Sequence, residues 1–123
     1  MPWQMSVNNQ HSILELHLSG TVSSDDLTVV LKEFFNMVEN VKIYLILADC
    51  TLLTDGHSVF DLYSLANHIL QSPLVREFRE AVLLPKSPNF VENVKFWETV
   101  CFNRGIQVQI FDDRDKAIAW LLQ

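Results

Sequence analysis

The first part of the chain has the two-residue period that is typical of β-strands. Two short extended runs flank a polar turn at residues 8–10, and in the second run three leucines alternate with Ile13, Glu15 and His17. Such alternation indicates a strand that buries one side against a core. We therefore predict an antiparallel hairpin at the start of the chain.

A helical period follows the hairpin. Hydrophobic residues recur at helical spacing between Leu27 and Val38, while Lys32 and Glu33 point to the other side. Ser23 lies three residues before Asp26, which is the spacing of a capping box with Asp in place of Glu or Gln. The pattern predicts an amphipathic helix.

Three more helices are expected from the same period and from residues that favour helix starts. Proline at a first helical position, and serine or aspartate just before it, are such signals. The expected segments are residues 58–71, residues 88–104 after Ser87 and before Gly105, and residues 114–123 after Asp112 or Asp113.

The segments between these helices indicate strands. Residues 41–50 are nearly all apolar, which favours a central strand covered on both faces. Residues 80–84 form a shorter apolar run that Pro85 stops, and residues 106–111 alternate. The order β-β-α-β-α-β-α-β-α predicts an α/β fold with a mixed, mostly parallel five-stranded sheet and helices packed on it. We expect a single domain over residues 1–123.

Composition excludes several classes of protein. The net charge is −6, and no cluster of Lys or Arg is available to neutralise several phosphates, so nucleic-acid binding is not expected. The longest apolar runs are about seven residues, against roughly 20 for a membrane span. The start of the chain lacks the basic and apolar regions of a signal peptide. We expect a soluble, cytoplasmic protein with two free thiols.

Three stretches suggest a family. They are residues 19–27 (SGTVSSDDL), residues 43–49 (IYLILAD) and residues 108–122 (VQIFDDRDKAIAWLL). With this order of elements, the chain resembles the SpoIIAA-like branch of the STAS domain superfamily. The resemblance covers almost the whole chain and implies a bacterial regulatory module.

The resemblance also implies a switch, from which this sequence departs. Anti-sigma-factor antagonists of the family bind a partner kinase and are switched by phosphorylation of a serine in an Asp-Ser-Ser-Gly loop. That loop corresponds roughly to residues 49–58, where Gly56 directly follows Asp55 in place of the serine. We therefore expect no functional serine switch. Thr54 and Ser58 remain as nearby hydroxyls, and an N-cap role also explains Ser58.

The carboxyl ends of parallel strands are where open α/β sheets bind ligands. We name the residues expected there the candidate rim: Asp49, Thr54, Asp55, Gly56, His57, Ser58 and Lys86. Carboxylates and an imidazole are able to act as acid and base. Each also has a structural alternative, since Asp55 and Asp112 suit turns or caps and His57 and Lys86 suit solvated positions. No catalytic motif accompanies them, so neither an enzyme nor a cofactor is expected.

Metal binding and redox chemistry are not expected either. His57 and His68 lie about 16 Å apart on a helix, and His57 with Asp61 supplies at most two ligands. Cys50, at a strand end, is expected to be partly exposed, and Cys101 fits a buried helix face. Neither thiol has a neighbouring basic residue or a CxxC spacing.

Surplus aromatic residues indicate an interface. Phe60, Phe96 and Trp120 fall outside or at the edge of the expected buried stripes, and grouped exposed aromatics mark contact surfaces. The leading hypothesis is a non-enzymatic module that binds a protein partner or forms a homodimer. The alternative is a small apolar ligand or lipid in a cavity under the second and third helices, as in the CRAL-TRIO domains to which SpoIIAA-like domains are compared. An enzyme that uses the acidic rim is a weaker third possibility.

Overall fold

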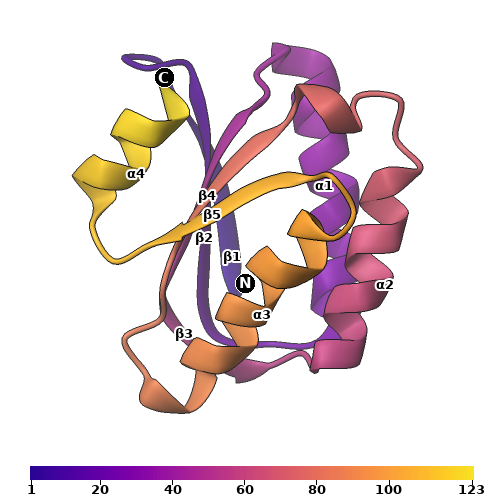
Figure 1. Cartoon of the computed structure of the whole chain (residues 1–123), viewed down its shortest axis with the longest axis vertical. Helices are drawn as coiled ribbons and strands as arrows, with labels where there is room; N and C mark the ends of the chain where they lie inside the picture. Colours follow the sequence, from indigo (N-terminus) through magenta and orange to yellow (C-terminus); the bar gives the residue numbers. More distant parts are fainter.

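The computed structural model describes all of residues 1–123, which form one five-stranded sheet with helices on both faces (Figure 1). The predicted order of strands and helices is confirmed. The elements are β1 (Trp3–Asn8), β2 (Ile13–Val22), α1 (Ser24–Val41), β3 (Leu45–Gly56), α2 (Val59–Leu70), η1 (Val75–Glu77), β4 (Arg79–Leu83), η2 (Pro88–Phe90), α3 (Val91–Phe102), β5 (Gln107–Phe111) and α4 (Arg114–Leu121).

The strands lie in sequence order across the sheet. β1 pairs antiparallel with β2, and β2, β3, β4 and β5 are parallel to one another. The predicted mixed, mostly parallel sheet is therefore confirmed. Since the four parallel strands run the same way, their carboxyl ends point to one border of the molecule.

Three helices cover one face of the sheet and α4 covers the other (Figure 1). The main core lies between the sheet and α1, α2 and α3, and a smaller core of six buried residues lies under α4. The prediction that β2 buries one side only is therefore wrong. Ile13 is fully buried and Glu15 is 7% exposed, because α4 returns from the end of the chain to cover them.

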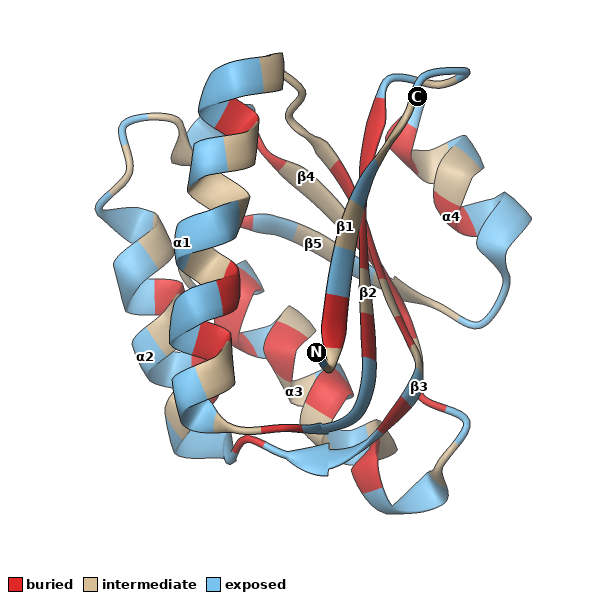
Figure 2. Ribbon diagram, turned by 180° about the vertical axis from the view of Figure 1, so that it is seen from behind, coloured by how far each residue is buried: buried red, intermediate tan, exposed pale blue.

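β3 is longer than predicted and starts later. Val41 ends α1, Lys42 adopts a left-handed conformation, and the strand then runs from Leu45 to Gly56. The end of β2 supplies the partner, since Gly20 pairs with Leu53 and Val22 with Gly56. Most of the predicted loop at residues 49–58 is therefore strand. Its last residues, from Thr54 to Gly56, are exposed (Figure 2).

The helix starts follow local sequence, with one exception. Ser23 and Ser58 each form the full capping box, with Asp26 and Asp61 respectively, and Asp113 caps α4. The third helix does not start at Pro88. A 3-10 turn occupies Pro88–Phe90, Ser87 makes no side-chain cap, and α3 begins at Val91. None of the helices has the length and hydrophobicity that crossing a bilayer requires.

Candidate functional site

The candidate rim residues lie in two separate places. Thr54, Asp55 and Gly56 form the exposed end of β3, and the backbone N–H of Lys86 donates to the carbonyl of Thr51 on the same strand. Asp49 lies six residues before Asp55, which is about 20 Å along an extended strand. Asp49 instead pairs with Leu83, the last residue of β4, so it lies level with the ends of β4 and β5 and not beside Asp55.

Gly56 is held in a conformation that only glycine adopts easily. Its φ is 138°, and a Cβ built on it would lie 1.9 Å from the carbonyl oxygen of Val22. Any larger residue would have to displace the β2 backbone. The glycine at this point is therefore explained by the close approach of two strands.

His57 is buried, so the alternative of a solvated histidine is wrong. Its side chain meets the edge of Phe90 at 5.1 Å between ring centroids, and its carbonyl accepts from the Asn93 amide. Phe90 covers the His57 ring because the segment between β4 and α3 lies at the carboxyl end of the sheet. Burial lowers the pKa of His57. Two buried polar atoms here, Nδ1 of His57 and Oδ1 of Asn93, have no hydrogen-bond partner.

Ser58 is occupied as a helix cap. Its hydroxyl accepts from the backbone N–H of Asp61 and donates to the Asp61 carboxylate at 3.0 Å. The Ser58 backbone N–H donates to the same carboxylate and lowers the pKa of Asp61. The structural role expected for Ser58 is confirmed.

Asp49 belongs instead to a polar network on the α4 face of the sheet. One of its carboxylate oxygens accepts from the Thr51 hydroxyl at 2.6 Å, and the other lies 3.5 Å from Nδ1 of His17. Nε2 of His17 lies 3.2 Å from Glu15. His17 therefore lies between the carboxylates of Asp49 and Glu15.

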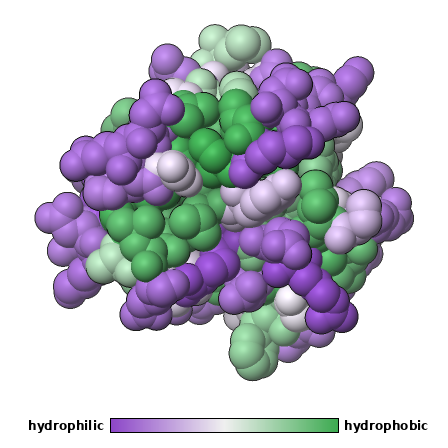
Figure 3. All heavy atoms as spheres, turned by 90° about the horizontal axis from the view of Figure 1, so that it is seen from above, coloured by the Kyte–Doolittle hydropathy of each residue, from purple (hydrophilic) through white to green (hydrophobic).

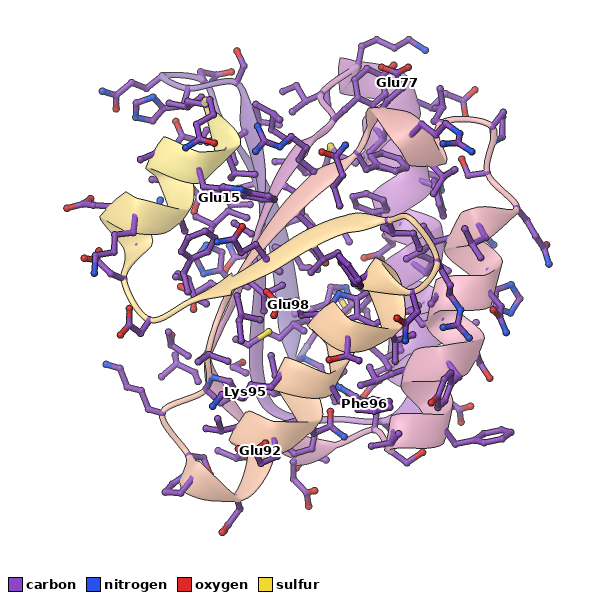
Figure 4. The ribbon with its side chains drawn as sticks, viewed as in Figure 1. Glu15, Glu77, Glu92, Lys95, Phe96 and Glu98 are labelled. Atoms are coloured by element: carbon purple, nitrogen blue, oxygen red, sulfur yellow. The ribbon has the colours of Figure 1, made fainter.

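Glu15 is the centre of that network and lies beside α4 (Figure 4). It accepts from Asn8 at 3.0 Å and from Arg114 at 2.6 Å. The hydrogen bond from Arg114 lowers the pKa of Glu15 and outweighs the opposing effect of burial. Sequence reasoning missed this network because its members come from both ends of the chain. The alternation of Glu15 and His17 on one side of β2 was the available signal.

Exposed aromatic and aliphatic side chains gather on α2 next to the rim, and the half-buried Phe96 of α3 adjoins them. Phe60 is 77% exposed, Val59 is 41% exposed, and the ring of Tyr63 meets Phe96 edge-on at 5.6 Å. Figure 4 shows Phe96 on the side of α3 that faces α2. We call these four residues, Val59, Phe60, Tyr63 and Phe96, the aromatic face.

Trp120 does not belong to the aromatic face. It lies on α4, on the other side of the sheet, where its ring stacks under the Arg79 guanidinium at 4.2 Å and contacts Phe111. The three aromatic residues selected from sequence are therefore on two surfaces. Trp120 is explained by these contacts within the fold.

An apolar cavity of about 130 Å³ lies between the sheet and α1, α2 and α3. Of its 22 lining residues, 19 are hydrophobic, and the other three are His57, Glu80 and Gln107. Phe34 and Phe78 line it and belong to an aromatic cluster towards the amino ends of the parallel strands. Seen from that end, hydrophobic side chains reach the surface between hydrophilic ones (Figure 3).

Glu80 is the acidic group in this cavity. Its carboxylate accepts a hydrogen bond from the Trp97 indole at 2.7 Å and forms no ion pair. Burial raises the pKa of Glu80 to about 7, although the Trp97 hydrogen bond acts in the opposite direction. The carboxyl therefore exchanges its proton near neutral pH.

Both cysteines are buried, so the prediction of a partly exposed Cys50 is wrong. Cys50 faces the main core because β3 continues past it, and burial raises the pKa of both thiols. No group of three or more His, Cys, Asp or Glu side chains is arranged to hold a metal ion.

The sheet order, the three helices on one face and the single helix on the other define a SpoIIAA-like α/β fold. Sequence comparison gives no relative, since no family model and no curated protein matches the chain. Solved structures do match it.

Two solved structures illustrate the similarity. One is an uncharacterized protein of the DUF3478 family with a SpoIIAA-like fold from Shewanella loihica PV-4, with a TM-score of 0.60, 20% identity, and coverage of 97% of this chain and 91% of that one. The other is the anti-sigma factor antagonist SpoIIAA in its unphosphorylated form, with a TM-score of 0.61, 13% identity, and coverage of 97% and 96%. At these identities the likeness shows the fold, and the resemblance inferred from sequence is confirmed at that level.

Proposed function

We propose that this chain is a non-enzymatic, STAS-like regulatory module that binds a protein through its rim and aromatic face. The observation that carries the proposal is the adjacency of the two. Ser58 ends the rim and caps α2, and Val59 and Phe60 follow it directly with 41% and 77% of their surface exposed. Exposed aromatics beside a polar edge have the composition of a protein interface.

The fold relatives support a regulatory role. One solved structure of the same fold is an anti-sigma factor antagonist, a protein that acts on other proteins. In this chain, the position that we align with the phosphorylated serine is Gly56, and the strained backbone there favours glycine. The neighbouring Ser58 hydroxyl is engaged with Asp61. These features support partner binding without a serine phospho-switch.

The first partner to test is a second copy of the chain. We expect the purified protein to form a homodimer, and Phe60→Ser to shift it to a monomer in size-exclusion chromatography with light scattering. Phe102→Ser is the matched control, because Phe102 is equally exposed at 77% but lies about 9 Å further along α3 than Phe96. A dimer that survives Phe60→Ser would exclude the aromatic face as its interface.

If the purified protein is strictly monomeric, the partner is a different protein. Affinity capture from the source cells would then compare the unmodified chain with both variants. We expect a partner that Phe60→Ser loses and Phe102→Ser keeps. Intact-mass measurement of protein from the same cells tests the switch, since a phosphate on Thr54 or Ser58 would contradict its absence.

The cavity favours a second function, which is the binding of a small apolar molecule under α2 and α3. Its volume of about 130 Å³ is close to that of an engineered cavity of about 150 Å³ that binds benzene. Native mass spectrometry of the purified protein would detect a retained ligand. Failure of the protein to bind any apolar probe of this size in solution would contradict the second function.

A further inference from the structure

The polar lining of the cavity indicates which apolar molecules it selects. Glu80 is the second residue of β4 and projects to the side of the sheet that α1, α2 and α3 cover. Its side chain is half-buried, and the cavity wall that it joins is mainly aliphatic and aromatic, with Val82, Val108 and Trp97 among the lining residues. A carboxylate in such surroundings is destabilised unless a cation or several donors compensate it.

The protein itself supplies only part of that compensation. Trp97 donates one hydrogen bond, and no Lys, Arg or His forms an ion pair with Glu80. A negative charge at one point of an apolar cavity is complemented by a ligand that carries one positive charge and an apolar body. An ammonium group adds both the charge and the N–H donors that the carboxylate lacks.

We propose that this cavity binds a small primary amine whose ammonium group pairs with the Glu80 carboxylate and whose apolar body fills the space between the sheet and the helices. The inference rests on the second proposed function, binding of a small apolar molecule in the cavity.

Fatty acids and other carboxylates are disfavoured by the same geometry. A ligand carboxylate near Glu80 would place two like charges in an apolar space, which forces one of them to bind a proton. Neutral hydrocarbons fit the space but leave Glu80 uncompensated. The cavity should therefore rank amines first, neutral molecules second and anions last.

The ionisation of Glu80 makes the binding depend on pH. The other titratable groups around it are Cys50 and Cys101, whose thiols stay neutral because burial raises their pKa. His57 lines the same cavity and is kept neutral by burial. Affinity for an amine should accordingly rise from about pH 6 to about pH 8, as Glu80 loses its proton.

The experiment is a heteronuclear NMR titration of the full chain with benzylamine, toluene and benzoate. We expect benzylamine to bind at least about tenfold more tightly than toluene, and benzoate to bind most weakly. Glu80→Gln, which keeps an acceptor for Trp97, should weaken benzylamine binding at least about tenfold and abolish its pH dependence, so that benzylamine no longer binds more tightly than toluene. Glu77→Gln, an exposed glutamate nearby in sequence, should change nothing.

Three other results would overturn the amine inference, and one of them would also overturn the second proposed function. Equal binding of toluene and benzylamine, with no effect of Glu80→Gln, would overturn the amine inference and leave the second proposed function intact. A preference for benzoate would also overturn it. No binding of any of the three probes would overturn both the inference and the second function.

Discussion

The guanidinium of Arg114 lies 2.6 Å from the carboxylate of Glu15 and joins the first turn of α4 to the first part of β2 across 99 residues of sequence. Glu15 is almost fully buried, so its carboxylate depends on this partner and on Asn8 for compensation. The contact therefore helps to hold α4 on its face of the sheet.

Loss of this contact should destabilise the protein in a pH-dependent way. Arg114→Gln should lower the free energy of unfolding by about 1 kcal/mol at neutral pH. The bond to Arg114 lowers the pKa of Glu15, so its contribution is present above the ordinary glutamate pKa and disappears as the pH falls through the lowered value. Urea unfolding at about pH 7 and about pH 3 checks this, because the difference between variant and parent should shrink in acid. Lys116→Gln, on the exposed side of the same helix, is the control; an equal effect of that change would remove the role given to Arg114.

Glycine at position 56 should be far less replaceable than glycine at position 20. Both have a positive φ, but a Cβ at Gly20 meets nothing within 4 Å whereas one at Gly56 meets the Val22 backbone. Gly20→Ala should cost about 1 kcal/mol of unfolding free energy, and Gly56→Ala about 3 kcal/mol or more. Chemical denaturation measures both. Similar costs for the two variants would mean that β2 and β3 separate easily at their ends.

Glu80 should make the protein less stable as the pH rises. Its pKa is about 7 in the folded state and near 4.5 as an ordinary glutamate, so the folded state binds the proton more tightly. Stability should fall between about pH 4.5 and about pH 7 and then level off, by a total on the order of 3 kcal/mol. In Glu80→Gln this fall should be absent. Thermal unfolding across the range, with Glu77→Gln as control, tests it; parallel profiles for parent and Glu80→Gln would contradict an ionising carboxyl in the cavity.

His57 should have the opposite dependence. Burial lowers its pKa, so the folded state favours the neutral ring. Stability should fall as the pH drops below about 6.5, where the histidine of the unfolded chain gains its proton. His57→Gln should reduce that loss relative to the parent, and His68→Gln, at an exposed position on α2, should not. A profile that His57→Gln leaves unchanged would show that the ring is hydrated in solution.

Local features of the fold could be predicted from sequence because neighbouring residues decide them. The capping boxes at Ser23 and Ser58 need only a residue three positions later, and the apolar periods of α1 and β5 need only one element. The candidate site was harder. Thr54, Asp55 and Gly56 do lie at the carboxyl border of the sheet, since parallel strands bring their ends together. Asp49 lies level with the last residues of β4 and β5, but the end of β2 carries β3 several residues beyond it.

The sequence by itself determined the order of the strands and helices, their caps and the hydrophobic faces that build a SpoIIAA-like sheet. These depend on periods and spacings within about 20 residues. Tertiary structure alone decided that Arg114 reaches Glu15, that Phe90 closes over His57 and that Trp97 is the single partner of Glu80 in an apolar cavity. The physical reason is that burial and charge compensation depend on which distant segments pack together, and no local period encodes that choice.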